Sequence, residues 1–257
     1  QDGFFPQSVS EVAKGFTKKD IKEYYHFYPW GQCPDTLRPQ ISQYYEEANG
    51  LAKELLGWIE KHSPSEVSGK YSQPLGDMIK DSDQTLLRIL HYPPLKGDEE
   101  VDAIRAAAHE DINLITILPA SNEPGVQGQA KDGSWLDVPC DFGNLIVNIG
   151  DMLEIWSNGE FVATSHRVRK VKEERYSFPL FFACDYHTMV EPLPELVARH
   201  GQARYSALKA GDHLFAQTIQ TFRYLRERLA KGEIALPEGA REVGSLGQHG
   251  KHKEDPL

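Results

Sequence analysis

The sequence predicts a mainly β fold with flanking helices, built on an antiparallel barrel or jelly-roll core. Many short strand-like segments follow one another between residues 86 and 184, with no helical repeat between them. Helical periodicity is confined to segments on either side, near residues 40–62 and 214–229. A parallel α/β sheet, in which helices alternate with strands, is therefore not expected.

A chain of 257 residues can bury a large core. We expect a single domain over residues 1–257, in three parts. Residues 1–85 form a helical and irregular amino-terminal part. Residues 86–190 form the jelly-roll core, and residues 191–257 form a carboxy-terminal helix with a loose polar tail.

The first predicted helix covers residues 40–62, where apolar side chains recur at steps of three and four residues. Pro64 ends it, because proline disfavours the helical conformation of the residue before it. A second helix is predicted near residues 74–82, and a third from Leu214 to Leu229. The aromatic residues 24–30 are expected to pin an irregular loop onto the domain.

The strand segments are rich in β-branched and aliphatic residues, and turn residues separate them. Gly150-Asp151 is expected to shape one turn and Ser157-Asn158-Gly159 another. The expected strands are residues 86–92, 113–118, 133–138, 144–149, 152–156, 160–172 and 175–184.

Charge and cysteine content exclude several classes of function. With 28 basic and 38 acidic residues the net charge is −10, which argues against general affinity for nucleic acid or for an anionic membrane. No apolar run is long enough to span a membrane, and no signal peptide is recognisable. Three cysteines without close pairing are typical of a reducing compartment. We therefore expect a cytoplasmic protein whose partner is a small molecule.

Two histidines and a carboxylate form a candidate metal site. His109 and Asp111 lie two residues apart at the mouth of a predicted strand, so both side chains point to one face. His166 lies within a later strand and could approach from a facing strand. Such a set binds one face of a ferrous ion and leaves the other face open for a co-substrate and oxygen. The alternative is three unrelated polar residues at strand ends.

A second cluster fits a carboxylate. Arg175 and Ser177 share one strand face, and a guanidinium inside an apolar barrel is costly unless it meets an anion. Tyr92 could donate a third hydrogen bond. A surface salt bridge of Arg175 with an adjacent glutamate is the alternative. His91 either lines the pocket or fills a strand position, whereas His213 and the other histidines are interpreted as ordinary core or surface residues.

The sequence resembles a known family through five motifs between about residues 86 and 190. It is similar to the isopenicillin N synthase-like family of iron(II)- and 2-oxoglutarate-dependent oxygenases. In the amino-terminal part only Gly3-Phe4-Phe5 matches the usual opening. The motifs are Leu90-His91-Tyr92-Pro93-Pro94, His109-Glu110-Asp111 with the following Ile112 to Thr116, Asn148-Ile149-Gly150-Asp151, His166-Arg167-Val168 and Glu174-Arg175-Tyr176-Ser177.

The resemblance implies a distorted double-stranded β-helix, a form of jelly roll, with iron(II) held by His109, Asp111 and His166. It also implies that Arg175, Ser177 and Tyr92 bind the distal carboxylate of 2-oxoglutarate. With O2, and with ascorbate as a supporting reductant, such a dioxygenase oxidises a C–H bond of a small organic substrate and releases succinate and carbon dioxide. Hydroxylation is the default outcome, and desaturation or ring closure are the variants.

Two other functions stay open. An oxidase like isopenicillin N synthase uses no 2-oxoglutarate, and there the arginine and serine would bind the carboxylate of the substrate itself. A jelly-roll protein that binds a metal or an anion without turnover is the non-catalytic alternative. An amino-acid-like or secondary-metabolite substrate is the expectation for either enzyme.

Overall fold

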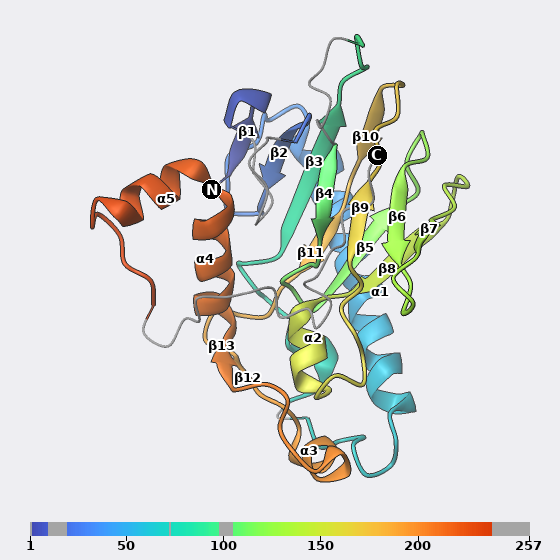
Figure 1. Ribbon diagram of the computed structural model, residues 1–257, viewed down its shortest axis with the longest axis vertical. Coiled ribbons are helices and arrows are strands. Elements are labelled where there is room, and N and C mark those ends of the chain that lie inside the picture. Colours follow the sequence, from blue (N-terminus) through green and yellow to red (C-terminus); the bar gives the residue numbers. More distant parts are fainter. Residues whose placement is uncertain (1, 10–19, 72, 98–104, 238–257) are drawn as a thin grey trace.

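The computed structural model describes residues 2–9, 20–71, 73–97 and 105–237, and in them the chain forms antiparallel sheets. The large sheet has the order β1-β2-β3-β11-β5-β8, with β10 also pairing with β3 (Figure 1). Its strands are β1 (Gly3–Phe5), β2 (Glu23–Phe27), β3 (Leu86–Tyr92), β5 (Ile115–Pro119), β8 (Leu145–Ile149), β10 (Arg175–Ser177) and β11 (Leu180–Phe182). The mainly β fold is confirmed.

A smaller sheet has the order β4-β9-β6-β7. Its strands are β4 (Ala106–His109), β6 (Val126–Gln129), β7 (Trp135–Asp137) and β9 (His166–Val168). A separate pair joins β12 (Met189–Val190) to β13 (Leu208–Lys209). The small sheet faces the large one, because Ala106 and Val168 from the small sheet pack with Leu90 and Tyr92 from the large sheet.

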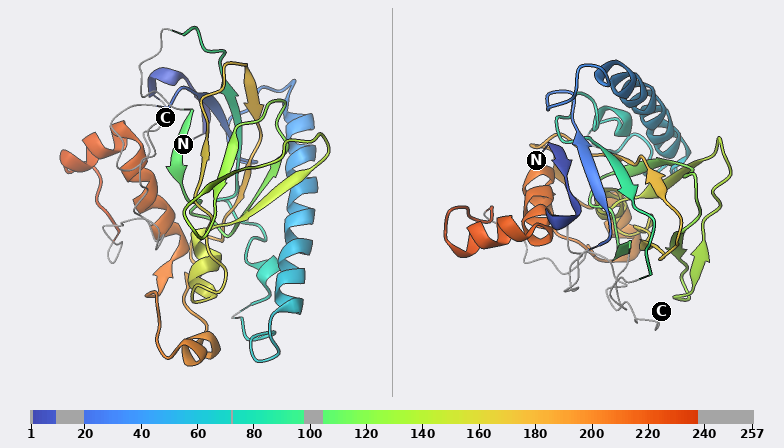
Figure 2. Two further views of the ribbon diagram at one scale, coloured as in Figure 1. Left: turned by 45° about the vertical axis from the view of Figure 1, so that its right-hand side comes forward. Right: turned by 90° about the horizontal axis from the view of Figure 1, so that it is seen from above.

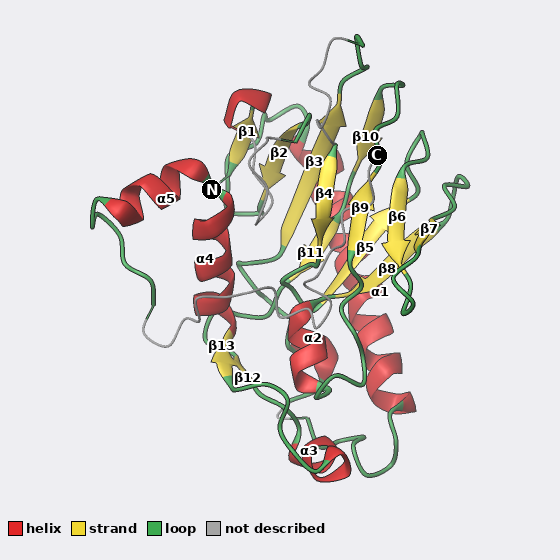
Figure 3. Cartoon of the chain, in the orientation of Figure 1, coloured by secondary structure: helices red, strands yellow, loops and turns green. Residues whose placement is uncertain are grey.

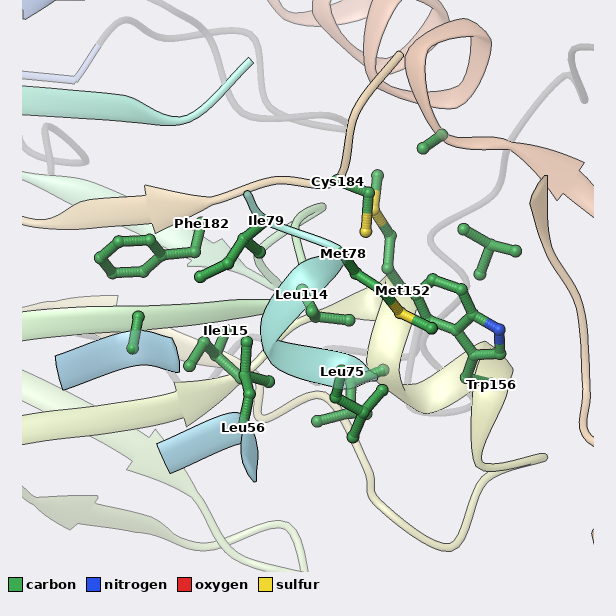
Figure 4. Close-up of a cluster of buried hydrophobic side chains, with 14 of the residues drawn as sticks. Leu56, Leu75, Met78, Ile79, Leu114, Ile115, Met152, Trp156, Phe182 and Cys184 are labelled. Atoms are coloured by element: carbon green, nitrogen blue, oxygen red, sulfur yellow. The ribbon is translucent and has the colours of Figure 1, made fainter. Parts of the chain in front are cut away.

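The two faces of the large sheet bury different cores. Helix α1 (Arg38–His62) covers one face, and α4 (Ala210–Thr221) lies on the other side of the strands (Figure 2). Side chains alternate between the two faces, so Leu87 joins the α1 core while Leu90 joins the core between the sheets. The core on the α1 side extends from the strands to α2 (Asp151–Trp156), and it includes Leu56 from α1, Ile115 from β5 and Trp156 from α2 (Figure 4).

Helix α1 is the element that the sequence predicted best. Its buried residues are Tyr45, Ala48, Ala52 and Leu56, which follow the predicted apolar repeat. Pro39 stands in its first turn, where no amide hydrogen is needed, and the helix ends at His62, shortly before Pro64, as expected. None of the helices in the described part of the chain is both long and apolar enough to cross a membrane.

The predicted strand at residues 152–156 is wrong, because this segment is the helix α2. All six residues of α2 are buried, the acidic Asp151 and Glu154 included, so its apolar residues follow neither the strand period nor the helix period. Figure 3 shows α2 as a short helix just below the strands. The predicted strand at 160–172 is reduced to β9, and the predicted strand at 175–184 is divided into β10 and β11.

The amino-terminal aromatic run is not the loop that we expected. Residues 23–27 form β2, and its side chains Tyr24 and Phe27 are buried on opposite faces of the sheet. β1 corresponds to Gly3-Phe4-Phe5 of the family resemblance. The short strands β4 and β6 were not predicted, since four residues are too few to establish a period.

The carboxy-terminal part differs from the prediction in two ways. The expected single helix is broken at Phe222, whose extended backbone separates α4 from α5 (Arg223–Ala230). A further helix, α3 (Pro194–His200), was not predicted.

The helix expected near residues 74–82 is only the short η2 (Leu75–Asp77). The loose tail predicted after residue 237 lies outside the described residues.

Candidate metal centre and carboxylate pocket

His109 and His166 lie side by side at one end of the small sheet, where β4 ends and β9 begins. β4 and β9 pair in antiparallel fashion with His109 opposite His166, and the two ring centroids are 4.4 Å apart. His166 therefore comes from the neighbouring strand of the same sheet, not from a facing strand as the sequence suggested. Cross-strand pairing is what holds the two rings together.

Asp111 completes the cluster from the connection between β4 and β5. We expected Asp111 to share a strand with His109, but β4 already ends at His109. Its Oδ1 lies 3.8 Å from Nε2 of His166. One donor atom from each of the three residues lies within 4.8 Å of the other two. The interpretation of three unrelated polar residues is therefore wrong.

Each histidine ring is oriented by a hydrogen bond to a backbone carbonyl two residues earlier in the chain. Nδ1 of His109 donates to the carbonyl of Ala107 at 2.7 Å, and Nδ1 of His166 donates to the carbonyl of Thr164 at 3.0 Å. A carbonyl only accepts, so Nδ1 carries the proton in each ring. The lone pair of each Nε2 is left for a metal ion, which is the usual arrangement of histidine ligands.

The Asp111 carboxylate is held by two donors from the large sheet. Its Oδ2 accepts hydrogen bonds from Thr116 Oγ1 at 2.6 Å and from Asn148 Nδ2 at 2.7 Å. Thr116 and Asn148 are register partners on β5 and β8, so adjacent strands aim both donors at one oxygen. Sequence reasoning missed these two residues as parts of the site, although both belong to the motifs that carry the family resemblance.

The charges of the cluster suit a divalent metal. Burial would raise the pKa of Asp111, but the two histidines and the two hydrogen bonds outweigh it and lower that pKa overall. The pKa of His109 is also lowered, because the surrounding protein desolvates the ring and because His166 lies next to it. An ionised carboxylate and a neutral imidazole are the forms that bind a metal.

Arg175 and Ser177 point into the space between the sheets, as predicted. Both are buried, at 1% and 4% exposure, whereas Tyr176 between them is exposed. Tyr92, the register partner of Arg175 on β3, is also buried, and its ring centroid lies 5.2 Å from the guanidinium carbon. The alternative of a surface salt bridge for Arg175 is therefore wrong.

The guanidinium of Arg175 has unused hydrogen-bonding capacity. Its Nε donates to the carbonyl of Glu123 at 3.2 Å, but the buried Nη1 has no hydrogen-bond partner within the described residues. Burial lowers the pKa of Arg175, which expresses the cost of a cation away from water. A buried cation with a free donor fits an anionic ligand, and a carboxylate matches its planar fork.

His91 does not share this space. Strand alternation places it on the face opposite Tyr92, where its ring bridges Glu23 and Glu174 at 2.8 Å each and stacks on Tyr176. Of the two interpretations of His91, the one as a pocket residue is wrong. The raised pKa of His91 has two opposed causes, burial that lowers it and the two carboxylates that outweigh this.

Arg105 is a buried cation that the sequence did not reveal. It is fully buried, and its Nη2 donates to the carbonyls of Pro93 at 3.1 Å and Glu173 at 2.6 Å. Arg105 thereby ties the start of β4 to the residue after the end of β3 and to the segment just before β10, next to Tyr92. A single arginine before a run of alanines gives no periodic signal, so sequence reasoning could not find it.

Comparison with known proteins identifies the family. The model of the 2OG-Fe(II) oxygenase superfamily matches residues 84–183, which contain every residue of the two clusters. A candidate oxygenase of Shewanella oneidensis with a known crystal structure is 52% identical, at a TM-score of 0.67, over 91% of this chain and 77% of that one. This chain belongs to the 2OG-Fe(II) oxygenase superfamily.

Curated relatives in the superfamily are more distant. The 2-oxoglutarate-dependent dioxygenase 11 of Oryza sativa subsp. japonica is 32% identical over 187 residues, which cover 72% of this chain and 50% of the relative. Isopenicillin N synthase of Amycolatopsis lactamdurans is 29% identical over 217 residues, covering 82% and 63%. The chain spans about half the length of the first curated relatives that it matches.

Superfamily membership confirms two expectations. The two facing antiparallel sheets are the double-stranded β-helix of this superfamily. Iron(II) is the cofactor of this superfamily and 2-oxoglutarate its co-substrate, and the cluster of His109, Asp111 and His166 is the candidate iron site of this chain.

Proposed function

We propose that this protein is an iron(II)- and 2-oxoglutarate-dependent dioxygenase that oxidises a C–H bond of a small organic substrate. One observation carries the proposal. Three convergent donor atoms of His109, Asp111 and His166 share the interior between the sheets with the buried, incompletely bonded guanidinium of Arg175. A metal site beside a carboxylate site is the combination that a 2-oxo acid bound to iron requires.

In the proposed enzyme His109, Asp111 and His166 bind the iron through two nitrogens and one oxygen. Arg175 and Ser177 bind the distal carboxylate of 2-oxoglutarate, and Tyr92 adds a hydroxyl beside the guanidinium. When bound, iron supplies the activation of O2, so that 2-oxoglutarate, O2 and the substrate give succinate, carbon dioxide and hydroxylated product. The residues of the chain hold and orient the reactants and keep water out.

An oxidase that does not use 2-oxoglutarate is the second candidate. The similarity to isopenicillin N synthase favours it, because the match to that enzyme covers a larger share of this chain than the match to the dioxygenase of Oryza does. Arg175 would then bind the carboxylate of the substrate itself. The same donor set serves both reactions, so a measurement of co-substrate consumption has to distinguish them.

Succinate formation is the deciding test. Protein supplied with iron(II), ascorbate and 2-oxoglutarate should form succinate slowly without a second substrate, and His166→Ala should abolish it. His187→Ala, which changes an exposed histidine, is the matched control and should form succinate at the wild-type rate. No succinate above an iron-free control, alone and with candidate substrates, would favour the oxidase.

The substrate class and the setting belong to the same proposal. We propose a small substrate, amino-acid-like or a secondary metabolite, because the interior between the sheets is partly apolar and holds a buried cation. The net charge of −10 argues against a polyanionic partner such as nucleic acid. Unpaired cysteines Cys33, Cys140 and Cys184 are in keeping with the cytoplasm. We also propose that the chain acts as one domain.

A further inference from the structure

The segment that carries Asp111 rests on the first turn of α2. The backbone amide of Asp151 donates to the carbonyl of Asp111 at 2.8 Å, and the amide of Met152 donates to the carbonyl of Asn113 at 3.2 Å. Gly150 permits this close approach, because a Cβ at that position would lie 2.1 Å from the carbonyl oxygen of Asn113. The start of α2 therefore determines where the backbone of Asp111 lies.

The side chain of Asp151 faces the other way, towards α4. Its Oδ2 lies 3.8 Å from Nε2 of His213, and both residues are more than nine-tenths buried. Asp151 Oδ1 and His213 Nε2 are buried atoms without a hydrogen-bond partner within the described residues. The turn-forming role expected for Asp151 needs no buried carboxylate, and the ordinary core role expected for His213 needs no ring nitrogen there.

Burying two polar groups is unfavourable unless they interact, and apolar residues of similar volume would pack as well or better. The pair joins two elements far apart in sequence: α2, which supports the Asp111 backbone, and α4, which packs beside the strands (Figure 1). A continuous line of contacts thus runs from α4 through His213, Asp151 and the Asp111 backbone to the candidate metal ligands.

We propose that Asp151 and His213 are positioning residues for the metal centre, which seat α2 and α4 against each other and so hold Asp111 where it can bind the metal. This inference rests on the proposed function only in that Asp111 is a metal ligand. Neither residue belongs to the three candidate metal ligands. Their effect is expected on metal affinity rather than on the chemical step.

The test uses Mn(II) as the probe, with the free ion measured by electron paramagnetic resonance, and thermal unfolding measured alongside. Asp151→Asn removes the negative charge, and His213→Phe keeps a ring but has no nitrogen. Each should weaken Mn(II) binding by roughly 10-fold, the lower end for residues that support metal ligands. His213→Gln restores a nitrogen donor and should recover most of the affinity, which a purely steric role would not.

Gln217→Leu is the matched control, because Gln217 is a buried polar residue one turn further along α4. It should bind Mn(II) as the wild type does, whatever its midpoint of unfolding. The double variant of Asp151→Asn and His213→Phe should lose no more affinity than either single variant, since the two side chains act as one unit.

The inference is overturned if both single variants bind Mn(II) like the wild type, or if Gln217→Leu weakens binding as much as they do. If His213→Phe does not fold, the Mn(II) affinity of Asp151→Asn compared with that of Gln217→Leu decides the question. Failure of the wild type to bind Mn(II) would instead count against the metal site itself. The two failures can therefore be told apart.

Discussion

The metal centre and the carboxylate pocket are held in different ways. Each metal-ligand candidate has further partners, since both histidine rings donate to backbone carbonyls and Asp111 accepts two hydrogen bonds. Within the described residues Arg175 donates from Nε to the carbonyl of Glu123, and its buried Nη1 has no hydrogen-bond partner there. The metal centre is therefore preorganised by the protein, whereas the pocket is completed by its ligand.

Removal of a metal ligand should give the largest effect. Asp111→Ala deletes the one anionic member of the cluster, together with the carboxylate that accepts from Thr116 and Asn148. We therefore expect loss of Mn(II) and iron(II) binding and of succinate formation. Metal titration and the succinate assay measure this. Asp141→Ala, at an exposed position, should behave as the wild type. Binding retained in Asp111→Ala would show that the cluster is not a metal site.

Arg175→Lys tests the pocket without disturbing the metal centre. Lysine keeps the charge but loses the planar fork, so at least one hydrogen bond to the carboxylate should be lost. Such a bond to a charged group contributes about 1.5–3 kcal/mol, so its loss should raise the KM for 2-oxoglutarate by roughly 10- to 150-fold. Mn(II) affinity should not change. Arg169→Lys, at a more exposed arginine, is the control, and an unchanged KM in Arg175→Lys would exclude a ligand-binding role.

Thr116→Val tests how far the metal centre depends on its supporting hydrogen bonds. Valine keeps the shape but removes the hydroxyl that donates to Asp111 at 2.6 Å. We expect about a 10-fold loss of Mn(II) affinity and little change in the folding of β5. Thr188→Val, outside the cluster, should leave the affinity unaltered. Equal affinities would mean that Asn148 alone orients the carboxylate and that preorganisation is weaker than we infer.

The smallest effect is expected at His91, behind the pocket. Its ring joins Glu23 to Glu174 across β3, and its pKa is raised because these two carboxylates outweigh burial. A raised folded-state pKa means that the stabilisation is fully present below the unfolded-state pKa and is lost as the pH rises through the folded-state pKa. The stability difference between the wild type and His91→Gln, measured by urea unfolding, should therefore shrink as the pH rises above about 6.5.

His91 and its partners are partly exposed, so the difference should not exceed about 1 kcal/mol. A difference that stays constant across this range would mean that the ring acts through its stacking on Tyr176, which lies at 4.9 Å between centroids, rather than through its charge.

The residues of the candidate site could be predicted from the sequence more accurately than the secondary structure that positions them. His109, Asp111, His166 and Arg175 could be named because their residue types and order imply a reaction. The strand pairing that brings the two histidines together could not be named, since β4 and β9 are too short to show a period. Likewise α2 was misread because all its side chains are buried, and Arg105, Asp151 and His213 act through tertiary contacts that leave no local pattern.

The pairing of β4 with β9 also has a consequence for how the chain reaches its native state. β9 has three residues, so few hydrogen bonds fix its alignment. A slip of one residue would turn the His166 side chain to the other face of the sheet and dismantle the donor set. A metal ion that binds only the correctly aligned chain stabilises that form by mass action. Metal present during folding would thus select the correct strand alignment as well as equip the finished protein.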